Sequence, residues 1–152
     1  MNDSRALKLY EKFFIYGGIG WCIELIFTSI ASQVEGDGDI TLRGYSYLWM
    51  PFIWGTGTIL VERVGQRVKD YKWYLRGSVY ALVCFGVEYA AGILLYLLTH
   101  RIPWDYSKSM FSVNGAIRLD YFPFWFLAGL AAEKIYNIIN RVEIRNDNSN
   151  TD

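Results

Sequence analysis

Residues that build metal and redox sites are scarce in this chain, which has two cysteines and one histidine among 152 residues. Cys22 and Cys84 each lie inside an apolar run, where a free cysteine commonly serves as a small packing group. Neither a disulfide nor a metal-ligand cluster is therefore expected. A glycine-rich phosphate loop with its lysine is also missing, so the sequence predicts no cofactor, and any ATP would be bound by another chain.

Neither sign of charge is in excess, because 15 lysines and arginines balance 15 aspartates and glutamates, and no long basic stretch suggests a nucleic-acid partner. Apolar residues are abundant instead. The chain is 53% hydrophobic and 18% aromatic, with a mean hydropathy of +0.13. These values exceed those usual for soluble domains, and the length allows one domain. The composition predicts a small integral membrane protein whose first partner is the lipid bilayer.

Four apolar segments are long enough to form transmembrane helices. The expected spans cover residues 13–31, 45–61, 77–99 and 121–139. They predict an all-α fold with one four-helix transmembrane domain at residues 1–139. The polar residues 140–152, rich in asparagine and aspartate, are expected to form a disordered tail.

Lysines and arginines are distributed unevenly between the segments that connect these spans. Residues 62–76 alone hold five of them. Together with the two termini and Lys134, that side of the membrane carries eleven basic residues and the other side carries four. Because lysines and arginines beside short loops favour the cytoplasmic side, the sequence predicts a multi-pass protein of the plasma membrane with both termini cytoplasmic.

The two halves of the chain look duplicated. Matching positions in the second and fourth spans are Pro51-Phe52 with Pro123-Phe124, Gly57 with Gly129, and Glu62-Arg63 with Glu133-Lys134. The first and third spans likewise each carry one glutamate. This pattern indicates two repeated helical hairpins related by an axis along the membrane normal. Chance similarity between apolar segments is the alternative explanation.

Those two glutamates, Glu24 and Glu88, each lie eleven residues from the start of their span. At ~1.5 Å per residue, both carboxylates are expected roughly 17 Å from the inner membrane boundary, and thus at one depth. One interpretation is a pair that lines a polar crevice and binds a cation or carries protons, since intramembrane acids are costly. The alternative is that each is a hydrogen-bonded packing group that meets Tyr16, Trp21, Tyr89 or a backbone donor.

Residues 103–126 join a polar, aromatic-rich loop to the fourth span. Four of its side chains are candidates for an exterior substrate site: Asp105, Asn114, Arg118 and Asp120. The alternative is structural, with the arginine paired to an aspartate so that the loop folds onto the membrane surface. Charged residues of the second and fourth spans are expected at the interface between membrane and water, where a partner protein could dock. These residues are Glu62, Arg63, Glu133 and Lys134.

Several strings of the sequence carry a family resemblance: GGIGWCIEL, GYSYLWMPFIWG, WYLRGSVYAL, VEYAAG, PWDYS and NGAIRLDYFPFWFLAGLAAEKIY. Over residues 13–136 the chain resembles the bacterial four-span membrane family of putative ABC-transporter type IV, or CmpB-like, permeases. The resemblance implies a permease subunit that works with a separate ATPase. Since four spans are too few to enclose a translocation path, a homo-oligomer or a partner is also expected.

Three functions are compatible with these features. The leading hypothesis is a transport component that moves or gates a small solute, with Glu24 and Glu88 as polar contacts. The second is an integral membrane enzyme acting on a lipid or lipid-linked substrate, with Asp105 or Asp120 as acid or base and Arg118 holding an anionic head group. No nucleophile beside a base is visible, which disfavours an enzyme. The third is a noncatalytic scaffold or regulatory subunit.

Overall fold

The computed structural model describes the backbone of residues 7–35 and 41–148 and the side chains of residues 7–33 and 41–141. Helices dominate this part of the chain, as predicted. They are α1 (Leu9–Glu35), α2 (Met50–Val68), α3 (Trp73–Thr99) and α4 (Phe122–Asn148), with a short 3-10 helix η1 (Leu119–Tyr121) before α4. Two short strands, β1 (Ser112–Val113) and β2 (Ile117–Arg118), complete the fold.

The β1–β2 hairpin was not predicted, because its segment was assigned to a polar loop. The strands pair antiparallel, with Val113 opposite Ile117. Asn114 and Gly115 form the turn with positive φ angles of 52° and 71°. Asparagine and glycine are the residues that adopt two consecutive positive φ angles at little cost, and this combination gives the tight hairpin turn. The Asn-Gly pair was a readable hairpin signal.

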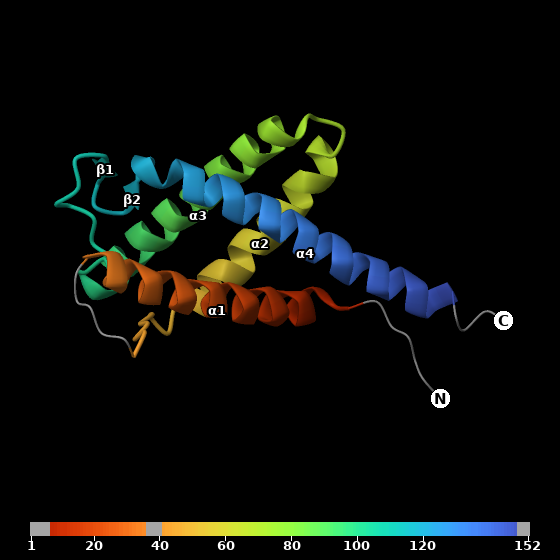
Figure 1. Cartoon of the computed structure of the whole chain (residues 1–152), viewed down its shortest axis with the longest axis horizontal. Coiled ribbons are helices and arrows are strands. Elements are labelled where there is room, and N and C mark those ends of the chain that lie inside the picture. Colours follow the sequence, from red (N-terminus) through yellow and green to blue (C-terminus); the bar gives the residue numbers. More distant parts are fainter. Residues whose placement is uncertain (1–6, 36–40, 149–152) are drawn as a thin grey trace.

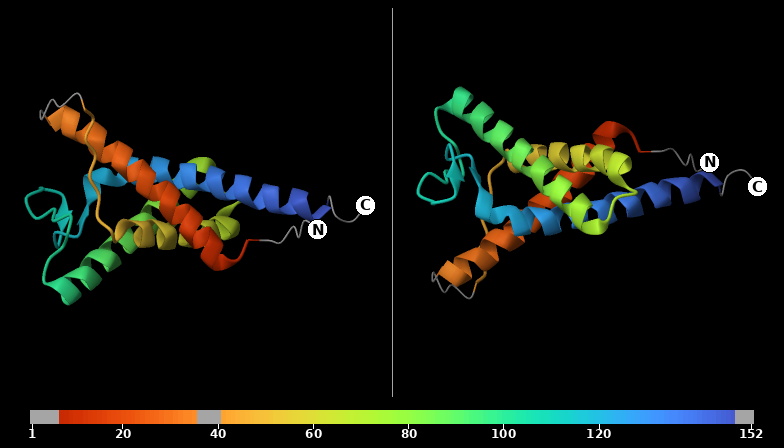
Figure 2. Two further views of the ribbon diagram at one scale, coloured as in Figure 1. Left: turned by 90° about the horizontal axis from the view of Figure 1, so that it is seen from below. Right: turned by 90° about the horizontal axis from the view of Figure 1, so that it is seen from above.

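The helices run roughly along the long axis of the molecule and define two ends (Figures 1 and 2). We call the end with the start of α1, the α2–α3 link and the last turns of α4 the terminal end. The hairpin end holds β1, β2 and the described residues 41–49 of the α1–α2 link. At the hairpin end, α1 and α3 diverge from each other in both views of Figure 2.

The helices pack as two close pairs, α1 with α2 and α3 with α4, and α2 also contacts α3 and α4. Glycines permit the close approach within each pair. A Cβ atom added at Gly20 would overlap the side chain of Trp54, and one at Gly129 would overlap Tyr80. At the centre the core consists of Tyr16, Val61, Tyr80 and Tyr136. Each half of the chain is therefore a glycine-packed helical hairpin.

Two helices of the described chain are long and apolar enough to cross a membrane. They cover Leu9–Gln33 and Trp73–Thr99, with mean hydropathies of 1.6 and 2.0. The first and third predicted spans lie inside them. Helix α4 continues to Asn148 through residues assigned above to a polar tail, because no glycine or proline interrupts residues 130–148. The last four tail residues lie outside the description.

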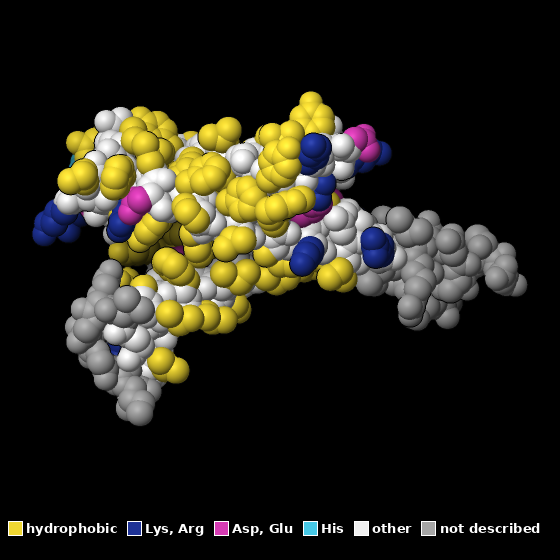
Figure 3. Space-filling model, turned by 45° about the horizontal axis from the view of Figure 1, so that its top comes forward, with side chains coloured by type: hydrophobic (Ala, Val, Ile, Leu, Met, Phe, Trp, Pro, Cys, Tyr) yellow, Lys and Arg dark blue, Asp and Glu magenta, His cyan; other side chains and the backbone are white. Residues whose placement is uncertain are grey.

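The exterior of the described chain is strongly apolar. Hydrophobic side chains cover most of the middle of the face in Figure 3, whereas charged side chains lie toward its ends. Phe14, Leu82 and Leu97 each leave about two thirds of their surface exposed, at 64%, 65% and 68%. Water-soluble monomers rarely expose apolar patches of this extent. Together with the two apolar helices, this surface is that of a membrane protein.

Candidate functional site

A cavity of about 460 Å³ lies between the four helices and the two links at the hairpin end. Both α1 and α3 contribute to its wall, where the two helices diverge. Glu24 of α1 and Glu88 of α3 line this same cavity. Its aromatic lining includes Phe27, Tyr47, Trp54, Trp104, Tyr106, Tyr121, Phe124 and Trp125. The two glutamates singled out from the sequence thus face one space.

Glu24 is held by two neutral donors from outside its own helix. Trp54 donates its indole N–H to one carboxylate oxygen (2.8 Å), and Ser46 donates its hydroxyl to the other (2.8 Å). Ser46 reaches this position because the α1–α2 link folds back along α1. There Thr28 Oγ accepts from the backbone N–H of Tyr45 (3.1 Å) and donates to its carbonyl (2.9 Å).

Glu88 has an equivalent arrangement. Trp125 donates its indole N–H (3.1 Å) and Tyr106 its hydroxyl (3.2 Å), one to each carboxylate oxygen. The hairpin positions Tyr106, whose backbone N–H donates to the carbonyl of Gly115 (2.9 Å). Burial, with the nearby charge of Glu88, raises the pKa of the Tyr106 hydroxyl above its ordinary value. The hydroxyl therefore stays protonated and remains a donor at neutral pH.

The links of the two halves meet over the cavity. The hydroxyl of Tyr47, in the α1–α2 link, donates to the backbone carbonyl of Pro103 in the α3–β1 link (2.5 Å). Both residues line the cavity. Burial raises the pKa of the Tyr47 hydroxyl, so it too keeps its proton. This hydrogen bond joins segments that are 56 residues apart in the sequence.

The sequence offered Tyr16, Trp21 and Tyr89 as partners for the two glutamates, and the structure places all three elsewhere. Tyr16 donates to Glu62 (2.8 Å), and the Tyr89 hydroxyl accepts from the side-chain amide of Asn114 (2.9 Å). The buried indole N–H of Trp21 has no hydrogen-bond partner among the described residues. The actual donors come from neighbouring helices and links, which sequence spacing within one helix cannot reveal.

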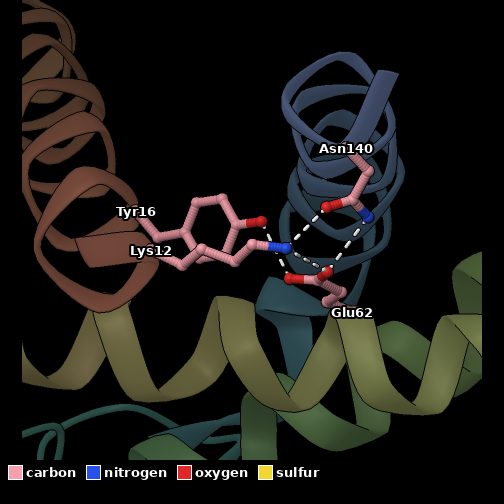
Figure 4. Close-up of polar contacts among 4 residues, drawn as sticks. All are labelled: Lys12, Tyr16, Glu62 and Asn140. Carbon is pink, nitrogen blue, oxygen red and sulfur yellow. Dashed lines mark hydrogen bonds and ion pairs between the residues drawn. The ribbon is translucent and has the colours of Figure 1, made fainter. Parts of the chain in front are cut away.

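A second pair of glutamates, Glu62 and Glu133, lies toward the terminal end. Figure 4 shows Glu62 of α2 between α1 and α4, where Lys12, Tyr16 and Asn140 converge on it. Lys12 forms an ion pair with the carboxylate (3.3 Å), and the Asn140 amide donates to it (3.0 Å). Glu62 is only 7% exposed. These contacts tie three helices together at one carboxylate.

Glu133 of α4 is neutralised in the same way by a base from the preceding helix. Arg76 of α3 contacts both carboxylate oxygens, through Nε (3.0 Å) and Nη2 (2.9 Å). Of the four residues predicted as a docking surface, Glu62 and Glu133 are therefore engaged inside the helix bundle. Arg63 and Lys134 are exposed.

Two contacts recur in the two halves in a fixed register, namely the ion pair between a base and a glutamate and the hydrogen bond from a tryptophan to a glutamate. The contact of Tyr16 with Glu62 does not recur, because the Tyr80 hydroxyl has no hydrogen-bond partner among the described residues. Lys12, Tyr16 and Glu24 of α1 correspond to Arg76, Tyr80 and Glu88 of α3 with an offset of 64 residues. Trp54 and Glu62 of α2 correspond to Trp125 and Glu133 of α4 with an offset of 71 residues. The prolines and glycines used in the sequence comparison give an offset one residue larger. The tryptophans were missed there, although each precedes a glutamate by eight residues.

Each candidate loop residue already has a hydrogen-bond or ion-pair partner within the chain. Arg118 pairs with Asp120 (2.5 Å), and its guanidinium lies 4.4 Å from the ring centre of Tyr121. The hydrogen bond from Arg118 lowers the pKa of Asp120. Asp105 accepts hydrogen bonds from the hydroxyl and backbone N–H of Ser107, which lower its pKa. Asn114 forms the hairpin turn. Of the four loop candidates, only Asp105 lines the cavity.

One family model matches the chain. The family is described as Putative ABC-transporter type IV, and the match covers residues 12–150. It includes α2, α3, α4, the hairpin and both pairs of glutamates, along with nearly all of α1. No solved structure matches the chain.

Proposed function

Because the chain belongs to the Putative ABC-transporter type IV family, we propose that it is the membrane component of a transport assembly and that its cavity binds the solute. One observation carries this proposal. Glu24 and Glu88 lie in the two helices that are apolar enough to span a membrane, and both line one cavity. An acid at that depth is costly unless it meets a polar group, and a transported solute supplies one.

In this proposal all four helices cross the bilayer as one domain covering residues 1–139. Helix α2 has 19 residues, and at ~1.5 Å per residue it extends roughly 28 Å, close to the thickness of the hydrocarbon core. The ion pairs of Glu62 and Glu133 allow α2 and α4 to carry acids toward the terminal end. That end faces the cytoplasm, because the α2–α3 link concentrates lysines and arginines there.

A single copy of the chain has too few helices to enclose a translocation path, so it requires further subunits to move a solute across the membrane. We propose that it works as a homo-oligomer or with a separate ATPase subunit, since the chain contains no phosphate-binding loop of its own. The exposed Arg63 and Lys134, toward the terminal end, are the docking candidates for that subunit. Replacing both by glutamate is expected to abolish co-purification of the ATPase while the membrane chain remains folded.

No observation favours the alternative of a lipid-modifying enzyme. Arg118 is engaged by Asp120 and by the Tyr121 ring, and Asp105 is held by Ser107. An arginine already paired with an exposed aspartate gains less from an anionic head group. The proposed acid, base and head-group contact are therefore already engaged by neighbouring groups of the loop.

The transport proposal is tested by solute flux into proteoliposomes, with and without the ATPase subunit. Glu24→Gln and Glu88→Gln are each expected to lower flux by about ten-fold or more, since a neutral amide removes the charge but keeps the size. Asp120→Asn, outside the cavity, serves as the matched control and is expected to retain flux. Absence of protein-dependent flux for every solute class tested with the ATPase subunit present would refute the proposal.

A further inference from the structure

The four helix glutamates described above differ in how their charge is balanced. The two terminal-end glutamates, Glu62 and Glu133, have Lys12 and Arg76 as basic partners. The two cavity glutamates, Glu24 and Glu88, accept only from indole N–H groups and hydroxyls. Among the side chains described, at residues 7–33 and 41–141, neither has an ion-pair partner. The repeated contacts thus leave two carboxylates without a counter-charge at the hairpin end.

The carboxylates of Glu24 and Glu88 line the same cavity. Glu88 is buried, with only 7% of its surface exposed. Charges in a site of low dielectric interact far more strongly than they do in water. A positive charge between the two carboxylates would be attracted by both and would offset their mutual repulsion. The ligand that fits this electrostatic environment is a cation.

Aromatic rings form much of the remaining wall. The rings of Trp54 and Trp125 lie 5.7 Å apart between centroids, and those of Phe27 and Phe124 lie 4.6 Å apart. Aromatic faces attract organic cations through the ring quadrupole, most strongly in tryptophan. Carboxylates that sit beside tryptophan and tyrosine rings combine the two interactions by which proteins bind ammonium groups.

The size of the cavity and its ligand atoms argue against a bare metal ion. A volume of about 460 Å³ lies in the range of sites for small organic molecules. Calcium takes six to eight oxygen ligands, and magnesium requires a near-octahedral set. The described residues contain no group of three or more histidine, cysteine, aspartate or glutamate side chains that could hold a metal.

We infer that the cavity binds a small organic cation, an amine or quaternary ammonium, with its charge between Glu24 and Glu88 and its carbon substituents against the aromatic wall. This inference rests on the proposed function and names the substrate class of that site. It assigns the two tryptophans a double role, because each orients one carboxylate through its N–H and also lines the space for the ligand.

Charge selectivity of the unmodified chain is the primary test. Choline and its neutral carbon isostere dimethylbutanol have nearly the same shape and differ in charge. Binding of each to the purified full-length chain is measured by isothermal titration calorimetry. Choline is expected to bind about ten-fold or more tightly than dimethylbutanol, and benzyltrimethylammonium more tightly still, because its ring adds aromatic contact. Equal affinities for choline and dimethylbutanol would overturn the inference.

Variants then locate the site. Glu24→Gln and Glu88→Gln are each expected to weaken choline binding by about ten-fold or more and to leave dimethylbutanol binding unchanged. Glu133→Gln makes the same acid-to-amide change at a carboxylate paired with Arg76 outside the cavity lining, and it should retain choline binding. Thermal unfolding verifies that each variant is folded at the assay temperature. Undiminished choline binding by a folded Glu24→Gln, Glu88→Gln double variant would also overturn the inference.

The failure of this inference and the failure of the transport proposal give different results. Choline binding that depends on both cavity glutamates, without flux of any solute, would support the cation site and refute transport. Flux of uncharged or anionic solutes that persists in Glu24→Gln and Glu88→Gln, with no binding preference for cations, would support transport and refute the cation site.

Discussion

At the scale of single residues, Trp54 and Trp125 determine the orientation of the carboxylates of Glu24 and Glu88 in the cavity. An indole N–H is a donor only, so it fixes the direction of a carboxylate without competing for a cation. Each tryptophan leaves the second oxygen of its glutamate to a donor from a link, Ser46 or Tyr106. Preorganised carboxylates of this kind lose little freedom when a ligand binds.

Replacing Trp125 by phenylalanine is expected to destabilise the chain. The substitution keeps an aromatic ring but removes the hydrogen bond to Glu88, a buried group. The free energy of unfolding should fall by about 1 to 3 kcal/mol, as measured by denaturant titration in detergent. Trp73→Phe is the control, because Trp73 is 61% exposed and has no hydrogen bond from its indole among those described. Similar losses in both variants would contradict this assignment.

The ion pair between Arg118 and Asp120 predicts how the stability of the folded chain changes with pH. Arg118 lowers the pKa of Asp120 in the folded chain, so the pair contributes fully to stability above the ordinary carboxyl pKa. That contribution is lost as the pH falls through the lowered pKa. Arg118→Gln is expected to return the pKa of Asp120 toward about 3.9, as followed by NMR titration of labelled aspartate. An unchanged pKa in the variant would show that the pair does not form in solution.

At the scale of helices and links, close packing depends on particular glycines. The sequence contains Gly18 and Gly20 in the same part of α1, and only the structure distinguishes them. A Cβ atom at Gly20 would overlap Trp54, whereas one at Gly18 would meet nothing within 4 Å. The position of each glycine around the helix therefore decides whether it has a packing role.

Gly20→Ala is expected to lower the free energy of unfolding by about 1 to 3 kcal/mol, because the added methyl group forces α1 and α2 apart. Gly18→Ala should be neutral or stabilise the chain by up to about 1 kcal/mol, through the higher helix propensity of alanine. Denaturant titrations of both variants compare the same chemical change on one helix. Equal effects would contradict the observed packing.

The helices could be predicted from the sequence because long apolar runs are a local property of the chain. Glu24 and Glu88 could also be identified from the sequence as candidate site residues, since a lone acid inside an apolar run is a local feature as well. Their hydrogen-bond partners could not, because Trp54 and Trp125 reach them through helix packing. The hairpin was not predicted, because each strand has only two residues and therefore shows no alternating pattern, which leaves the Asn114-Gly115 pair as its signal in the sequence.

At the scale of the whole molecule, the two ends differ in character. The terminal end contains the ion-paired glutamates and the basic α2–α3 link, while the hairpin end contains the cavity and the folded links (Figure 2). An assembly that couples ATP hydrolysis to transport requires such a division, with the partner on one side and solute access on the other.

The proposed orientation predicts which cysteines a membrane-impermeant maleimide can label. In a Cys22→Ala, Cys84→Ala background, Met110→Cys at the hairpin end should be labelled in intact bacterial cells. Lys69→Cys, in the α2–α3 link, should be labelled only after the cells are lysed. Both native side chains are exposed, so access to the reagent depends on the side of the membrane. Labelling of Lys69→Cys in intact cells would reverse the assignment.

The hydrogen bond between Tyr47 and Pro103 has a kinetic consequence. It joins the two links at the cavity wall. If a solute reaches the proposed site between these links, the hydrogen bond must open first. Tyr47→Phe removes one oxygen atom and leaves both glutamates in place. Association and dissociation of choline should therefore accelerate together in stopped-flow traces, with little change in their ratio. The hydrogen bond between Tyr47 and Pro103 would then set how long a bound solute stays in the cavity. Glu24 and Glu88 would set which solutes bind.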